Sequence, residues 1–82
     1  MQYEYKTKGT CSQRILFDIT EGKVSNVQFI GGCNGNLQGI SKLVDGMDVN
    51  AIIEKIEGIR CGMKPTSCPD QLARALKEAL EY

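Results

Sequence analysis

The chain has 82 residues, with ten Lys and Arg balanced by ten Asp and Glu and with no His, so its formal net charge is zero. A chain of this length buries only about 60% of its unfolded surface on folding, so we expect residues 1–82 to form one small domain. Zero net charge lacks the basic excess that drives nucleic-acid binding, and we expect no nucleic-acid partner. The absence of His excludes Ser-His, Cys-His and zinc-His sites built from this chain alone.

The N-terminal residues 1–6 are polar and mixed in charge, unlike the basic start and apolar stretch of a signal peptide. No apolar run approaches the roughly 20 residues that span a bilayer. We therefore expect a cytoplasmic protein with no membrane partner. Thiols stay reduced in that compartment, which favours metal ligation or thiol chemistry over disulfides for the four Cys.

The first half of the chain shows the two-residue alternation of β-strands in three segments, residues 2–8, 14–20 and 24–30. Between the second and third segments, Gly22 supplies the positive φ that a short hairpin turn requires. Val24 is out of step with Val27 and Phe29, which indicates a β-bulge. These segments predict a three-stranded antiparallel meander.

The second half shows apolar residues at helical spacing in three stripes: Leu37, Ile40, Leu43, Val44 and Met47; then Val49, Ile52, Ile53 and Ile56; then Leu72, Leu76 and Leu80. Asn34 or Asn36 is a candidate cap for the first helix, and Asp48 for the second. Ser67 and Asp70 have the spacing of a capping box at the start of the third. The predicted fold is α+β, in the order β-β-β-α-α-α, with the three helices packed on one face of the sheet.

The four cysteines fall in loops or at junctions between the predicted elements, at Cys11, Cys33, Cys61 and Cys68. A cysteine that acts as a small hydrophobic residue lies more often inside an apolar stripe. Cys68 also sits at a helix start, a setting that favours the thiolate, which is both the metal ligand and the nucleophile. A metal or cluster site, a redox thiol pair and structural thiols all remain open. We expect the helical carboxylates to be solvated rather than catalytic: Glu54, Glu57, Asp70, Glu78 and Glu81.

The string from Thr66 to Asp70, TSCPD in one-letter code, resembles the signature of the TSCPD domain family. The pairs at residues 11–12 and 61–62 and the stretch 31–36 fit that family as well. The resemblance covers nearly the whole chain and implies a stand-alone form of a domain that is also fused to the C-terminal side of adenosylcobalamin-dependent ribonucleotide reductases. It therefore implies a link to deoxyribonucleotide synthesis. It does not imply catalysis, because a radical-generating barrel and a cobalamin site do not fit in 82 residues.

The chain is also similar, more loosely, to the U-type iron–sulfur cluster scaffolds, which have an antiparallel sheet and a Gly-Cys turn into a helix. On that resemblance the ligands would be Cys33, Cys61 and Cys68. The chain departs from the scaffold pattern at residues 34–35, where Asn and Gly replace a carboxylate, and it has no His before Cys68. Cys11 is an additional cysteine.

Our interpretation is a metal-binding accessory domain in which Cys33, Cys61 and Cys68 are ligands and Cys11 is the fourth. Four thiolates suit either Zn²⁺ or an iron–sulfur cluster. The expected partner is a ribonucleotide reductase or another protein, and we do not expect the domain to catalyse a reaction alone. Three alternatives stay open: a dithiol relay through Cys61 and Cys68 to a reductase, an iron–sulfur scaffold, and a binding module that uses the polar face of the sheet.

Overall fold

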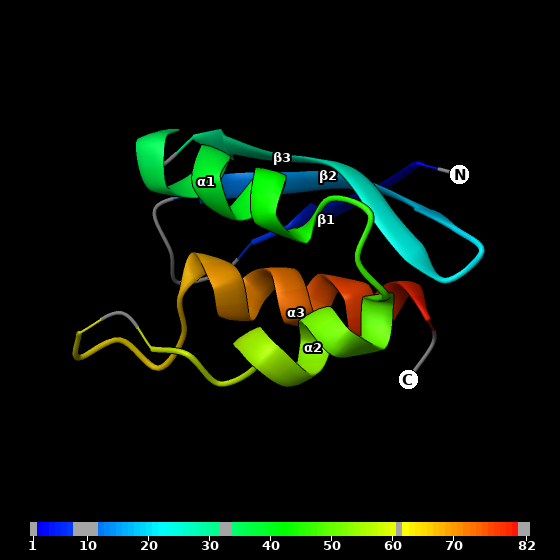
Figure 1. Cartoon of the computed structure of the whole chain (residues 1–82). Helices are drawn as coiled ribbons and strands as arrows, with labels where there is room; N and C mark the ends of the chain where they lie inside the picture. The colour runs from blue at the N-terminus through cyan, green and yellow to red at the C-terminus, as the bar shows by residue number, and fades with distance from the viewer. Residues whose placement is uncertain (1, 8–11, 32–33, 61, 81–82) are drawn as a thin grey trace.

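The computed structural model of the chain describes residues 2–7, 12–31, 34–60 and 62–80 (Figure 1). Three strands precede three helices: β1 (Gln2–Lys6), β2 (Ser12–Thr20), β3 (Lys23–Gly31), α1 (Asn34–Val44), α2 (Val49–Ile56) and α3 (Cys68–Ala79). The predicted α+β class and element order are confirmed. Both candidate caps of the first helix, Asn34 and Asn36, lie within α1, which begins at Asn34.

The strands form one antiparallel sheet in the order β1-β2-β3, so β1 and β3 are its edges. Glu21 and Gly22 join β2 to β3 with φ of 51° and 77°, as a two-residue hairpin turn of the primed type requires. The register between these strands shifts between Leu16 and Asp18, opposite Asn26, whose φ is 54°. This confirms the predicted bulge and explains why Val24 and Val27 both face the core.

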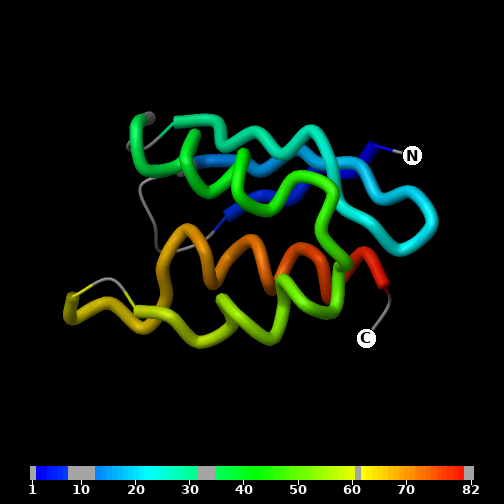
Figure 2. Tube along the Cα trace, in the orientation of Figure 1, coloured from blue at the N-terminus to red at the C-terminus, as the bar shows by residue number. Residues whose placement is uncertain are grey.

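The helices cover one face of the sheet, with α1 along β3 and α3 against β2 (Figure 1). α2 packs mainly against α3, and the two helices lie side by side below the sheet in Figure 2. The buried core is formed by residues of β2, β3 and all three helices: Ile15, Phe17, Val24, Val27, Val44, Val49, Ile52, Ile53, Leu72, Ala75 and Leu76. One predicted core position is wrong, because the side chain of Leu43 is 78% exposed.

The connection between α1 and α2 runs along the outer edge of β3 and pairs with its first half. The Val24 N–H donates to the carbonyl of Met47 at 2.9 Å, and the Gly46 N–H donates to the carbonyl of Val24 at 2.6 Å. The Asn26 N–H then donates to the Asp45 carboxylate at 3.1 Å. These contacts hold the bulge and cover this part of the edge.

Among the residues described, no helix combines the length and the apolar character that crossing a membrane requires.

Candidate functional site

Of the four predicted ligands, the structure places only Cys68, because Cys11, Cys33 and Cys61 lie outside the described residues. Described residues near two of them in the sequence are nevertheless close in space. Ser12, one residue after Cys11, and Gly31, two residues before Cys33, are register partners at the start of β2 and the end of β3.

The start of β2, the end of β3 and the starts of α1 and α3 all lie at the left end of the molecule in Figure 1. Antiparallel pairing explains the first two, and α1 follows β3 after a short connection. Within the described part of the chain there is no group of three or more His, Cys, Asp and Glu side chains that could hold a metal. Whether the four sulfurs meet therefore stays a prediction.

Cys68 is the first residue of α3 and is partly buried. Ser67 precedes it in extended conformation as the N-cap, and Pro69 occupies the first turn, where a missing N–H costs no helical hydrogen bond. The Ser67 hydroxyl accepts from the Asp70 N–H at 3.2 Å, which confirms the Ser67 half of the predicted capping box. The same hydroxyl donates to the carbonyl of Ile59 at 2.6 Å, so the cap also fixes the connection from α2.

Asp70 is 2% exposed, which corrects the expectation that its carboxylate is solvated. Its oxygens accept three hydrogen bonds: from the Thr66 hydroxyl at 2.5 Å, from the Gly58 N–H at 2.7 Å and from Arg74 Nε at 3.0 Å. Gly58 lies twelve residues earlier, just after α2. Asp70 therefore joins the end of α2 to the start of α3.

Two opposing effects set the pKa of Asp70. Burial of the carboxyl group on its own raises the pKa. The hydrogen bonds from Thr66 and Gly58, together with the charge of Arg74, lower it by more, and the pKa of Asp70 ends below its ordinary value. The hydrogen bonds and the charge at the start of α3 therefore stabilise the ionised form of the Asp70 carboxylate.

Gln71 and Thr66 complete the network, and both are buried, at 1% and 4% exposed. The Gln71 amide donates to the Thr66 hydroxyl at 2.9 Å, and that hydroxyl donates in turn to Asp70. The Thr, Ser and Asp of the motif thus make hydrogen bonds that hold the start of α3 in place. Cys68 is left as the member of the motif with metal or thiol chemistry to offer.

Sequence reasoning missed Thr66, Gln71 and the buried role of Asp70. One signal was present: the third position of a capping box normally reaches back toward the helix start. The partner that it finds here is Gly58, and no spacing rule points to a backbone N–H in a preceding loop.

Residues 1–80 match the family model for the TSCPD domain. Neither a curated protein nor a solved structure matches the chain. The match spans every described element, from β1 to the end of α3. It includes the motif whose hydrogen bonds are described above. The chain therefore belongs to the TSCPD domain family.

Proposed function

We propose that this domain holds a Zn²⁺ ion or an iron–sulfur cluster through Cys11, Cys33, Cys61 and Cys68, and that it serves a ribonucleotide reductase as an accessory module. The pairing of Ser12 with Gly31 is the observation that carries the proposal. It brings together a residue one position after Cys11 and a residue two positions before Cys33, at the end of the fold where Cys68 begins α3 (Figure 1).

The second support is the way in which the start of α3 is held. A ligand needs a fixed backbone, since freezing a mobile one would cost conformational entropy on binding. Ser67 and Asp70 anchor the backbone on both sides of Cys68 to Ile59 and Gly58. Those anchored residues lead directly into the segment that contains Cys61. The network therefore ties the flanks of two of the proposed ligands to one another.

The donor set fits the proposed groups. Four thiolates match a closed tetrahedral Zn²⁺ site, and they equally match the ligands of common iron–sulfur clusters. When bound, zinc would supply a cross-link between strand and helix ends, whereas a cluster would supply an electron carrier. For a chain of 82 residues with a small core, metal-binding free energy would add directly to folding free energy.

Family membership supports the link to ribonucleotide reductases, because related domains are fused to such enzymes. A chain with this small core supplies no radical-generating machinery of its own. The proposed role is therefore to bind the reductase or to serve it, and direct binding to an adenosylcobalamin-dependent enzyme, measured by calorimetry, tests that half of the proposal.

The metal is tested by mass spectrometry for zinc and iron, together with a thiol titration, on untagged protein purified without oxygen. We expect about one zinc ion or one cluster per chain, with the thiols masked. Cys68→Ser should lose the metal. Met63→Ser is the matched control. It removes an exposed thioether from the connection between α2 and α3 and should keep the metal.

Four reactive thiols and no metal in the wild-type protein would contradict the metal site. Reversible formation of a Cys61–Cys68 disulfide in that case would favour the dithiol relay instead. A coloured, labile centre after anaerobic reconstitution would identify the cluster rather than zinc.

A further inference from the structure

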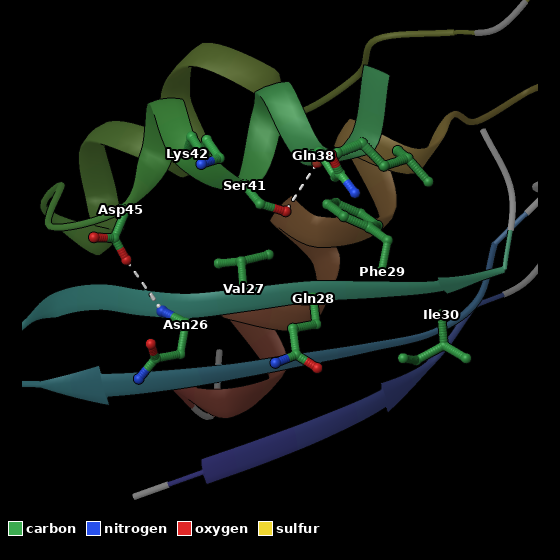
Figure 3. A pocket seen from close by; sticks show the side chains of 10 residues that line it. Asn26, Val27, Gln28, Phe29, Ile30, Gln38, Ser41, Lys42 and Asp45 are labelled. Atoms are coloured by element: carbon green, nitrogen blue, oxygen red, sulfur yellow. Dashed lines mark hydrogen bonds between the residues drawn. The ribbon is translucent and has the colours of Figure 1, made fainter. Parts of the chain in front are cut away.

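A hollow of about 500 Å³ lies between β3 and α1, well separated in the sequence from the TSCPD motif (Figure 3). We name it the β3–α1 groove. Val27 and Phe29 point from β3 toward the helix, whereas Gln28 and Ile30 point away from it (Figure 3). The α1 side is formed by Leu37, Gln38, Ser41, Lys42 and Asp45.

The edge of β3 that borders this groove, beyond the α1–α2 connection, has no backbone partner among the residues that the structure describes. Val24 is paired with Ile19 of β2. Its own N–H and carbonyl point away from β2 and form hydrogen bonds with the α1–α2 connection. Phe29 faces Ile15, four residues from Ile19 on β2. Since outward and inward groups alternate along an antiparallel ladder, the N–H and carbonyl of Phe29 also point outward. Within the described residues, neither group has a hydrogen-bond partner beyond the sheet.

We propose that the β3–α1 groove binds an extended, acidic peptide segment of a partner protein, which adds to the sheet as a fourth strand beside β3. Its backbone pairs with the N–H and carbonyl of Phe29. This is the strand-addition mode of peptide recognition, in which main-chain hydrogen bonds supply affinity and pockets for alternate side chains supply specificity.

The position of α1 argues for a single extended segment over a second copy of the domain. α1 lies along the edge strand itself (Figure 1). A helix with its side chains is about 10–12 Å across, whereas neighbouring strands are about 4.8 Å apart. A second copy that paired through its own β3 would bring its own α1 into the space that this α1 occupies. A lone strand brings no such helix.

Charge at the groove argues for an acidic segment. Lys42 lines the groove and is exposed, and it has no ion pair among the residues that the structure describes. Asp45, the other charged residue of the groove, keeps its negative charge, and its carboxylate is directed to the Asn26 N–H at 3.1 Å (Figure 3). The ammonium group of Lys42 is the group of the groove that complements a ligand carboxylate.

The side chains also set the pattern of the ligand. Val27, Phe29 and Leu37 make the inner wall of the groove apolar. Successive side chains of a strand point to opposite faces, so every second residue of the bound segment faces this wall. The expected ligand alternates apolar residues toward the groove with polar residues away from it, and carries a Glu or Asp near Lys42.

The test is selection from a phage-displayed library of random heptapeptides on the immobilised full chain. The enriched sequence is then synthesised with a fluorescein label, and its binding is measured by fluorescence anisotropy. Phe29→Pro removes the outward N–H, and Phe29→Leu is its matched control, because it removes the ring and keeps the N–H. Pro is tolerated on edge strands where the N–H does not serve the sheet.

We expect alternating acidic sequences to be enriched. One lost hydrogen bond weakens binding roughly fivefold, so Phe29→Pro should bind at least that much more weakly than Phe29→Leu. Lys42→Glu should bind roughly fivefold more weakly than wild type, and Lys42→Gln less so. Lys42 is exposed, so these two variants are expected to fold even if Phe29→Pro does not.

Three results would overturn the proposal. One is a selection in which no sequence is enriched. Another is enrichment of peptides that bind Phe29→Pro or Lys42→Glu as well as they bind the wild type. The third is a wild-type dimer at micromolar concentration in analytical ultracentrifugation that Phe29→Pro dissociates, since a second copy would then occupy the edge.

Discussion

α2 and α3 both begin with a residue whose side chain accepts hydrogen bonds from the first helical N–H groups, but the two caps differ in what else they hold. Asp48 caps α2 with an exposed carboxylate that accepts from the N–H groups of Asn50 and Ala51 at 3.0 and 3.2 Å. Ser67 caps α3 from a buried position, and its hydroxyl also reaches the carbonyl of Ile59. One cap closes its own helix, whereas the other also fixes the chain that leads into it.

The difference arises from burial. An exposed cap shares its hydrogen bonds with water, so its net contribution to stability is modest. At the start of α3, Thr66, Ser67, Asp70 and Gln71 are all buried, and among the described residues no buried side-chain N or O atom lacks a hydrogen-bond partner. Removing one member leaves others unsatisfied away from water, which costs more than the bond itself.

The largest effect is expected for Asp70→Asn. The amide keeps one acceptor oxygen but replaces the other with an NH2 group that faces donors, and it leaves Arg74 without its charge partner. We expect the free energy of unfolding to fall by about 3 kcal/mol, measured by urea denaturation. Glu54→Gln, on an exposed face of α2, is the control and should change stability by less than about 0.5 kcal/mol. A loss below about 1 kcal/mol for Asp70→Asn would show that the network is not what holds this end.

Ser67→Ala should cost less, about 2 kcal/mol, at the upper end of the range for helix caps. It removes the acceptor for the Asp70 N–H and the donor for the Ile59 carbonyl together. Ser67→Thr keeps the hydroxyl and should recover most of the loss. Equal destabilisation by both variants, in the same denaturation experiment, would mean that packing rather than the hydroxyl matters here.

Asp48→Ala is expected to cost about 1 kcal/mol, because only local N–H groups lose their acceptor and water can replace it. Asp48→Asn should be almost neutral, since Asn is an equally good cap. If Asp48→Ala destabilised the domain as much as Ser67→Ala, the contrast between the two helix starts would disappear.

The smallest expected effect is the pH dependence of stability through Asp70, because burial offsets part of what its hydrogen bonds contribute. Its pKa is lower in the folded than in the unfolded chain, so the contribution is complete above the unfolded pKa of about 4. It is lost as the pH falls through the lower folded pKa. In urea unfolding followed from pH 7 downward, the stability difference between wild type and Asp70→Asn should therefore narrow in acid. A constant difference would show that the ionised form is not favoured.

The elements and the bulge were predictable because each leaves a local trace. Alternation marks the strands, helical stripes mark the helices, and the phase break between Val24 and Val27 marks the bulge. Leu43 was misplaced because a stripe shows the direction of an inward face and not its width. α1 covers an edge strand, so its covered arc is narrow and Leu43 falls outside it.

The candidate site was less predictable, since its main contacts join distant residues. The cap by Ser67 and the position of Cys68 at the helix start follow from spacing within the motif. The buried carboxylate of Asp70 is paired with the N–H of Gly58, and these two residues lie close together because α2 packs against α3. The convergence of Cys11, Cys33 and Cys61 on Cys68 stays a prediction, because the first three lie outside the described residues.

The bulge on β3 also has a consequence for chain length. Side chains alternate along a strand, so most single-residue insertions or deletions turn one half of a strand inside out. Here the extra residue is already absorbed between Val24 and Val27, opposite Phe17. Losing one residue between those two valines would leave a regular strand with both still facing the core, at the cost of the contacts of Asn26 with Asp18 and Asp45. This stretch of β3 is therefore a place where the domain can shorten by one residue and keep its buried side chains on the same face.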